Sequence, residues 1–313
     1  MEPFILHHYD GSPFSEKVRL ILGYKGLDWR SVHIPNKLPK PDVLALTGAY
    51  RRTPILQRGA DIWCDTALIA RVLDRERPEP PLYPAEIAGT AQMLAQWADF
   101  TLFWSVIPYT LQPTGIVHVM PGITADGIKA FAADRAPFTA GMTRQTLADA
   151  TVALRSYLGW LETHLGDLAD GRGFLVRGQA SIADFSVGHC IWFMHLAPPL
   201  LGILEPFPNL RAWYERVKAF GHGTPTEMAS AEAVALAAAS GAHEATQVEP
   251  DLGFEAGESV TVMPTDYGRD LTVGALVGLN TTEVVIERHD ERAGRVHVHF
   301  PRLGFQIRKE AKA

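Results

Sequence analysis

The chain has 313 residues, which at roughly 150 residues per domain predicts two or three domains. Hydrophobic residues make up 47% of it, and this fraction excludes an intrinsically disordered chain. The formal net charge of −6 provides no basic surface, so we expect neither nucleic acid nor membrane as a partner. The two cysteines, Cys64 and Cys190, are far apart, which argues against a disulfide scaffold and a structural zinc site.

The opening residues lack the basic and long apolar regions of a secretory signal. The most apolar stretch, residues 187–204, is interrupted by two histidines and by Pro198-Pro199, so it is unsuited to spanning a bilayer. We therefore expect a cytoplasmic protein with reduced thiols.

Residues 1–84 alternate short apolar runs with amphipathic stretches, in the order β-α-β-α-β-β-α. Ser12 is a suitable N-cap for the first helix, and Pro13 suits its first position. The expected strands cover residues 3–8, 29–34, 54–57 and 61–63, and the expected helices cover 13–26, 41–46 and 66–76.

Residues 85–245 show helical periodicity and no convincing strand, which predicts a helical bundle domain. Its expected helices cover residues 91–107, 143–165, 182–196, 210–220 and 229–239, the last leading into a linker. The first carries an aromatic stripe with Phe103 and Trp104, followed by Tyr109. These side chains could line an apolar pocket for a second substrate, although such a stripe more often belongs to the core.

From residue 254 the hydrophobic period changes to two, which predicts a separate five-stranded barrel resembling an SH3 fold over residues 254–308. Residues 246–313 hold 8 basic and 11 acidic side chains, so we expect an interaction or lid role rather than nucleic-acid binding or catalysis. The expected inward positions are Val260, Val262, Val273, Val277, Val284, Ile286, Val296, Val298 and Phe300.

The segment Ser12-Pro13-Phe14-Ser15-Glu16-Lys17-Val18-Arg19 places a hydroxyl where a strand meets a helix. Backbone N–H groups and the helix dipole favour an anion there, and a thiolate is such an anion. Lowering a thiol pKa by two units takes about 2.7 kcal/mol. One hydroxyl donor to a charged acceptor supplies about 1.5–3 kcal/mol, which is sufficient. The plainer interpretation is that Ser12 only caps the helix.

A second group of residues could hold a peptide-like ligand. Pro54 opens a strand, where it can mark a cis bond, and Thr53 could then offer its backbone to the ligand. Asp65 and Thr66 stand at the start of the next helix and could bind an α-amino acid end, while Arg52 could meet a carboxylate.

These motifs resemble those of the glutathione S-transferases. Ser-Pro-Phe-x-x-Lys-Val-Arg is similar to the opening of the serine-type classes, and of the omega class with Ser12 in place of Cys. Arg-Thr-Pro-Ile-Leu at 52–56 resembles the segment with the family's cis-proline, and Asp65-Thr66 its Glu/Asp-Ser pair. Ser181-Ile182-Ala183-Asp184 resembles the family's capping box, and residues 207–213 the start of a later helix. The likeness covers about residues 1–225.

The resemblance implies a thioredoxin-like domain over residues 1–84, a helical domain over 85–245, and a homodimer. Glutathione would be a co-substrate, with no metal. Ser12 would donate to its sulfur, Thr53 would pair with the cysteinyl unit beside cis-Pro54, and Asp65 and Thr66 would hold the γ-glutamyl end. Arg52, helped by Lys40, would meet the glycyl carboxylate. Thr66 departs from the usual Ser, and Arg51-Arg52 is a double cation where one is typical.

Tyr9, at the end of the first strand, is the rival to Ser12 because other classes keep a catalytic Tyr there; a site without a catalytic hydroxyl is the third alternative. The expected function is transfer of glutathione to a small electrophile through its thiolate. The alternative is a non-catalytic binding or regulatory module that uses the C-terminal barrel to recruit a partner.

Three other reactive side chains receive plainer interpretations. Cys64 lies beside the expected site, but its strand context indicates a small buried hydrophobe. His297 and His299 share one strand face and could bind a metal, yet no third ligand is near in sequence, so a solvated pair is expected.

Overall fold

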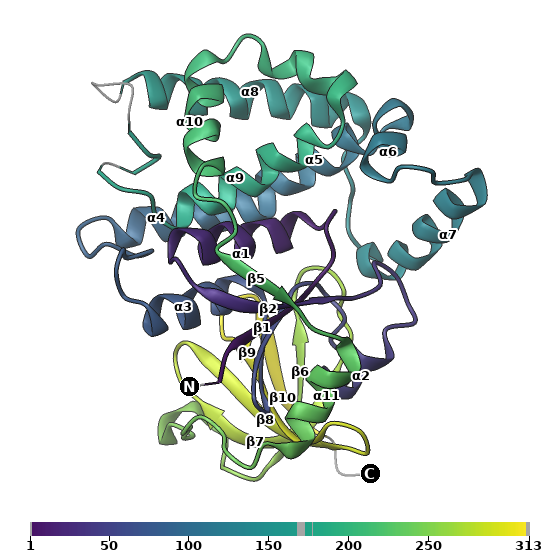
Figure 1. Ribbon diagram of the computed structural model, residues 1–313, viewed down its shortest axis with the longest axis vertical. Helices are drawn as coiled ribbons and strands as arrows, with labels where there is room; N and C mark the ends of the chain where they lie inside the picture. The colour runs from purple at the N-terminus through teal and green to yellow at the C-terminus, as the bar shows by residue number, and fades with distance from the viewer. Residues whose placement is uncertain (1, 168–172, 177, 311–313) are drawn as a thin grey trace.

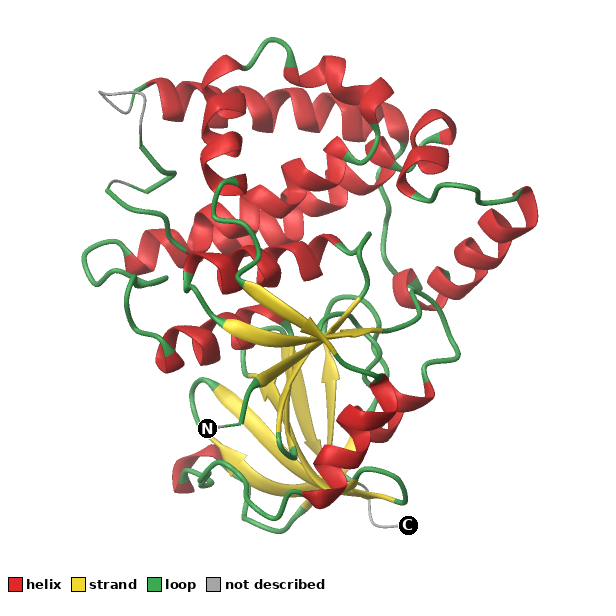
Figure 2. Ribbon diagram, viewed as in Figure 1, coloured by secondary structure: helices red, strands yellow, loops and turns green. Residues whose placement is uncertain are grey.

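The computed structural model describes residues 2–167, 173–176 and 178–310. Its strands form one sheet in the order β10-β6-β7-β8-β9-β4-β3-β1-β2-β5, below a thick layer of helices (Figures 1 and 2). The strands are β1 (Phe4–His8), β2 (Asp28–His33), β3 (Ile55–Arg58), β4 (Asp61–Cys64), β5 (Thr224–Glu227), β6 (Ser259–Pro264), β7 (Thr272–Leu279), β8 (Glu283–Asp290), β9 (Gly294–Pro301) and β10 (Phe305–Lys309).

The helices begin with α1, where the Ser12 hydroxyl accepts a hydrogen bond from the Ser15 amide at 3.2 Å and Pro13 occupies the first turn. The helix expected over residues 91–107 is two helices, α4 and α5, joined by a π-helical turn at Ala98–Leu102. The α-helices are α1 (Pro13–Tyr24), α2 (Pro41–Thr47), α3 (Thr66–Glu76), α4 (Ala88–Trp97), α5 (Phe103–Thr110), α6 (Pro113–Val119), α7 (Ala125–Arg135), α8 (Leu147–Gly166), α9 (Ile182–His195), α10 (Pro208–Lys218) and α11 (Ser230–Ala239).

Two hydrophobic cores lie on opposite faces of the sheet, and β1 contributes to both. Phe4 and Leu6 pack with α1, α3 and the helical layer, whereas Ile5 points to the other face. That second core contains α2, α11 and the inward side chains of the C-terminal strands. The N-terminal and C-terminal strands therefore share one core.

The C-terminal strands differ from the expected separate barrel. They form the antiparallel meander β6-β7-β8-β9, with β10 beside β6, but the closed SH3-like barrel is not confirmed, because the sheet is open and ends at β10 and β5. Strand β9 pairs in parallel with β4 instead, so that Asp61 lies opposite His297 and Trp63 opposite His299. This pairing satisfies the backbone groups along the edge of β4.

The expected phase of β7 is also wrong. Val273 is 43% exposed and Val277 is only partly buried, whereas Thr272 and Leu276 are buried. The pairing register with β8 shifts between Leu276 and Gly278. Such an irregularity interrupts the alternation of inward and outward side chains, which the prediction assumed along the whole strand. The other seven inward positions are buried as predicted.

Residues 85–245 are less uniform than expected. Strand β5 lies in this zone and pairs in parallel with β2, and its four exposed residues give no alternation to detect. Helix α11 packs against α2 and β9 rather than in the helical layer. The short helices α6 and α7 were not predicted. Among the described residues, no helix has the length and apolar character needed to cross a membrane.

Candidate functional site

A cavity of about 260 Å³ opens where the N-terminal strands, the helical layer and the C-terminal strands meet. Each of the three regions contributes part of its wall. The wall includes Arg52, Thr53, Pro54, Asp65 and Thr66 from the N-terminal region, Gln96, Asp99 and Phe100 from α4 and the π-helical turn, and Asp266, Tyr267, Pro301, Leu303 and Gly304 from the C-terminal region.

One wall is built by the start of β3 and the start of α3. The Thr53–Pro54 peptide bond is cis, as the resemblance predicted. Asp65 has a φ of 73°, in the left-handed region, and its carboxylate caps α3 by accepting from the Ala67 amide at 2.9 Å. Burial raises the pKa of Asp65, although the nearby Arg52 guanidinium opposes this shift. A peptide backbone and a helix N-terminus therefore face the same space.

Arg52 joins this wall to the C-terminal region. Its guanidinium donates to the Asp266 carboxylate and to the Tyr267 carbonyl, and it lies over the Tyr267 ring at 3.8 Å from the centroid. The Asp65 carboxylate is 4.0 Å from the same guanidinium. The charge of Arg52 in the cavity wall is thus already balanced by Asp266. From the sequence, the turn that holds Asp266 was expected to belong to a separate domain.

A buried charge network forms another side of the cavity. Lys17, which is fully buried, donates to Asp99 at 2.6 Å, and Asp99 also lies 3.1 Å from His189. Burial alone would raise the pKa of Asp99, but the Lys17 ammonium and His189 bring it below its usual value. Asp99 lies in the π-helical turn, a local widening that is frequent at functional sites.

Neither of the two candidate hydroxyls, of Ser12 and Tyr9, is among the residues that line the cavity. Ser12 is 2% exposed, and its oxygen is held by the Ser15 amide, which leaves its proton available to an acceptor. Phe14, two residues further, does line the cavity. Tyr9 is partly buried, and the Lys40 ammonium lies 5.8 Å from its ring centroid.

Lys40 is buried behind the cis-proline wall rather than in the cavity lining. Its ammonium donates to the Thr53 hydroxyl at 3.0 Å and to the Arg51 carbonyl at 3.4 Å. Burial lowers the pKa of Lys40 to about 8, and the positive charges of Arg135 and Arg51 act in the same direction. Lys40 therefore positions Thr53 in the structure as it stands.

The three aromatic candidates for a second-substrate pocket lie outside the lining of this cavity. Phe103 packs against Phe14 at 4.7 Å between centroids, and the Tyr109 hydroxyl donates to a backbone carbonyl. Trp104 contacts the Tyr267 ring edge-on at 5.3 Å. Their role toward a second substrate stays a prediction.

The two cysteines are free and fully buried, as expected of small hydrophobes. Burial raises the pKa of both the Cys64 and the Cys190 thiol well above the usual value. Neither has the electropositive, accessible surroundings of a reactive thiolate.

The expectation of a solvated histidine pair is wrong. His297 is 8% exposed and His299 is fully buried, because the pairing of β9 with β4 places both beside Asp61. His299 lies 3.1 Å from Asp61 and 3.1 Å from Glu283, and these carboxylates raise its pKa even though burial acts to lower it.

Comparison with known proteins agrees with this architecture. Residues 6–81 match the model of the glutathione S-transferase N-terminal domain, and residues 144–216 that of the C-terminal domain. A structure described as a GST-like protein from Pseudomonas syringae is 37% identical, with a TM-score of 0.80, and the match covers 99% of this chain and 100% of that one. The chain belongs to the glutathione S-transferase family.

More distant members share the fold over a smaller part. A glutathione S-transferase from Rhodospirillum rubrum F11 is 19% identical, with a TM-score of 0.52, and the match covers 69% of this chain and 88% of that one. The β-etherase LigF from Sphingobium is 18% identical, with a TM-score of 0.53 and coverages of 69% and 95%. The comparison with curated proteins gave no match. The match to the Pseudomonas structure covers nearly the whole chain, so it includes the C-terminal strands.

Sequence reasoning missed several cavity residues of this family member. Asp99 carried a signal, because it is a single acid on an otherwise aromatic helical stripe. Lys17 lay within the quoted motif, and a buried lysine needs a counter-ion. Asp266 and Tyr267 belong to an ordinary turn sequence, and nothing local indicates that this turn meets Arg52.

Proposed function

We propose that this chain is a glutathione-dependent transferase that acts on a small electrophile through the glutathione thiolate. One observation carries the proposal: the Thr53–Pro54 peptide and the N-terminus of α3 line the same cavity, beside the start of α1. An extended tripeptide needs backbone partners at its centre and charge-complementary groups at its ends. The cavity offers both kinds of group within one wall.

In this proposal Thr53 pairs with the cysteinyl unit, and Asp65 with Thr66 holds the γ-glutamyl amino acid end. The Asp65 carboxylate suits an ammonium, and the free N–H groups at the start of α3 suit a carboxylate. The glycyl carboxylate meets Arg52 after displacing Asp266, or shares the guanidinium with it. Lys40 supports this end by fixing Thr53.

The chemistry follows from the start of α1. The Ser12 hydroxyl donates to the glutathione sulfur, and the helix N-terminus adds favourable potential, so the thiol gives its proton to solvent at neutral pH. The thiolate then attacks the electrophilic carbon, a C–S bond forms, and the leaving group departs with the bonding electron pair. Proximity within the cavity supplies the rest of the rate enhancement.

The second candidate is a glutathione transferase-like binding module without turnover. The pairing of Arg52 with Asp266 favours it, because an internal carboxylate already occupies the cation that a substrate carboxylate would use. We also propose a homodimer, as in the family. The edge of β4 is taken by β9, so the dimer would use other surfaces.

Calorimetric titration of the full chain with glutathione, followed by turnover of a chloronitrobenzene, tests the proposal. We expect binding, turnover, and a rise in Kd of about ten-fold or more in Asp65→Asn, since a charge-assisted hydrogen bond contributes about 1.5–3 kcal/mol. The exposed Asp126→Asn serves as a matched control. Binding without turnover selects the module, and wild-type affinity in Asp65→Asn refutes the assigned site.

A further inference from the structure

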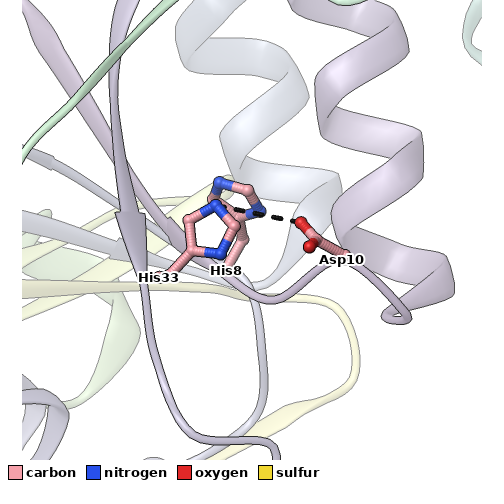
Figure 3. A group of neighbouring side chains, drawn as sticks. All are labelled: His8, Asp10 and His33. Carbon is pink, nitrogen blue, oxygen red and sulfur yellow. Dashed lines mark ion pairs between the residues drawn. The ribbon is translucent and has the colours of Figure 1, made fainter. Parts of the chain in front are cut away.

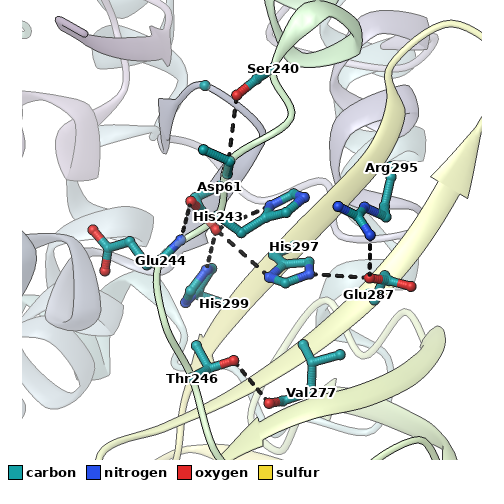
Figure 4. Close-up of polar contacts among 12 residues, drawn as sticks. Asp61, Ser240, His243, Glu244, Thr246, Val277, Glu287, Arg295, His297 and His299 are labelled. Carbon is teal, nitrogen blue, oxygen red and sulfur yellow. Dashed lines mark hydrogen bonds and ion pairs between the residues drawn. The ribbon is translucent and has the colours of Figure 1, made fainter. Parts of the chain in front are cut away.

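A second cluster of polar side chains lies away from the cavity, where β4 and β9 pair and the linker after α11 crosses them. Asp61 comes from β4, His297 from β9 and His243 from the linker (Figure 4). Their side chains are 6%, 10% and 8% exposed, respectively. Three segments far apart in sequence thus bring a carboxylate and two imidazoles together in a buried position.

The ligand atoms of these three residues lie close together. The Asp61 Oδ1 atom lies 3.6 Å from His243 Nδ1 and 3.9 Å from His297 Nδ1. The three ligand atoms all lie within 4.8 Å of one another. Bond lengths of 2.0–2.2 Å to a tetrahedral zinc ion give ligand separations of about 3.4 Å, so binding draws the ligand atoms closer together by up to about 1.4 Å.

The imidazole nitrogens have few other partners. Among the described residues, neither nitrogen of His243 has a hydrogen-bond partner, and neither has Nδ1 of His297. Leaving such groups unpaired when buried is costly. The two rings are stacked at 3.7 Å between centroids, and each nitrogen lone pair lies in the plane of its own ring, so the rings must turn apart to bind one ion together.

The surroundings resemble the outer shell of a metal site. The Nε2 atom of His297 lies 3.3 Å from the Glu287 carboxylate, so the nitrogen opposite the cluster has a carboxylate partner. Asp61 accepts from His299 at 3.1 Å and from the Glu244 amide at 2.8 Å. Hydrogen-bonded ligands of this kind are oriented before the ion arrives.

We infer that Asp61, His243 and His297 form a binding site for a divalent transition-metal ion of the Zn²⁺ type. Two imidazoles and one carboxylate are a donor set that Zn²⁺ accepts, and the fourth position is left for water. The bound ion ties the linker to the seam between the N-terminal and C-terminal strands. Its role is to stabilise this seam, which lies away from the glutathione cavity.

Another trio, His8, Asp10 and His33, also gathers within ligand distance, but its surroundings disfavour a cation (Figure 3). The Arg19 guanidinium lies 3.1 Å from His8 Nδ1, and the other nitrogen of His8 lies 3.0 Å from the Ser31 hydroxyl. The Asp10 and His33 side chains are 84% and 48% exposed. This trio provides a rival site for the experiment.

The test is titration of the metal-free full chain with Zn²⁺, with bound metal counted after dialysis and the melting temperature recorded. We expect one ion per chain, a higher melting temperature with Zn²⁺, and a tetrahedral absorption spectrum when Co²⁺ replaces it. His243→Gln should weaken Zn²⁺ binding more than ten-fold. It lies on a linker, so the apo fold should persist by circular dichroism.

Two histidine variants serve as controls. His289→Gln, on the exposed side of β8, should bind as the wild type does. His33→Gln removes the rival trio and should also leave binding unchanged. The inference is overturned if the wild type takes up no Zn²⁺, if His243→Gln binds equally well, or if His33→Gln is the variant that loses the ion. If His243→Gln fails to fold, His297→Gln gives the same comparison.

Discussion

Ser12 has two roles that a substitution can separate. As the cap of α1 it accepts from the Ser15 amide, and as the proposed donor it stabilises a thiolate. Ser12→Ala should cost about 1 kcal/mol of stability through the lost cap. With glutathione bound, the ultraviolet thiolate absorbance at neutral pH should fall at least ten-fold, because the hydroxyl donor is gone.

Tyr9→Phe is the matched control for this measurement, because it removes the rival hydroxyl and retains the ring that faces Lys40. Loss of the thiolate signal in Tyr9→Phe, with an unchanged signal in Ser12→Ala, would transfer the role to Tyr9. An unchanged signal in both variants would assign it to the helix N-terminus alone.

At the cavity wall, substitutions of Asp266 and Arg52 are predicted to change the affinity for glutathione in opposite directions. It balances the charge of Arg52, so a substrate carboxylate has to compete with it. Asp266→Asn should therefore lower the Kd for glutathione about ten-fold, while Arg52→Ala should raise it by a similar factor. Calorimetric titration measures both. If Asp266→Asn weakens binding, Asp266 orders Arg52 for the ligand instead of competing with it.

Lys40 should make the free energy of unfolding depend on pH in the alkaline range. Its pKa is lowered from 10.5 to about 8 by burial, so between these values the unfolded chain binds more protons than the folded chain. Stability should rise with pH across this window, by about 3 kcal/mol for this group. Lys40→Met should be more stable than the wild type at pH 7.5, and the difference should shrink by pH 10. Urea unfolding at both pH values tests this, with the exposed Lys129→Met as control.

At the scale of elements, β1 carries a dependence of the same sign in the acid range. His7 is fully buried and bonds to Gln57 at 2.7 Å, and burial lowers its pKa from 6.5 to about 4. The unfolded chain takes up a proton as pH falls below 6.5, and the folded chain does not until about 4. Stability should therefore fall by about 2 kcal/mol between pH 6.5 and 5.

His7→Gln should reduce this acid loss, whatever its stability at pH 7. Melting temperatures at pH 7 and pH 5 give the comparison, and the exposed His118→Gln should keep the full wild-type slope. An equal slope in His7→Gln would mean that other groups, His8 first among them, account for the acid sensitivity.

The elements that could be predicted were those with a clear hydrophobic periodicity and recognisable helix-capping residues. Helix α3 begins and ends where the sequence analysis placed it, and α1 begins at its predicted Pro13. Strand β5 was not predicted because all four of its residues are exposed and show no hydrophobic alternation. The inward positions of β7 were predicted wrongly because the strand contains a register shift. Neither an exposed edge strand nor a register shift can be inferred from the propensities of the local residues.

At the scale of the whole molecule, the pairing of β4 with β9 creates the parts of the structure that could not be predicted from the sequence. Parallel pairing between residues 61–63 and 297–299 joins segments over 230 residues apart, and nothing in either strand specifies the partner. The same pairing brings His297 to Asp61 and the 266–267 turn to Arg52. The cis-proline wall was predictable because its residues are close in sequence. The C-terminal wall and the histidine cluster were not.

This architecture changes the expectation for a truncated chain. From the sequence, a chain ending at Ala245 should keep glutathione binding, because the barrel was expected to be separate. In the structure, deletion of residues 246–313 exposes the edge of β4 and removes the C-terminal side chains that cover Ile5, Val32 and α11. Burial of each large aliphatic side chain contributes about 1.5–3 kcal/mol, against a total stability of about 5–15 kcal/mol.

The truncated chain should therefore lose its cooperative thermal transition and aggregate, as measured by circular dichroism and size-exclusion chromatography. The matched control is a full-length chain with a protease site inserted at the exposed Gly241 and then cleaved. Its fragments should remain associated, melt cooperatively and form the same cavity, because the strands are still present. A truncated chain that melts cooperatively and binds glutathione as the wild type does would show that the C-terminal strands are an independent addition. It would also show that Asp266 and Tyr267 contribute nothing to the site.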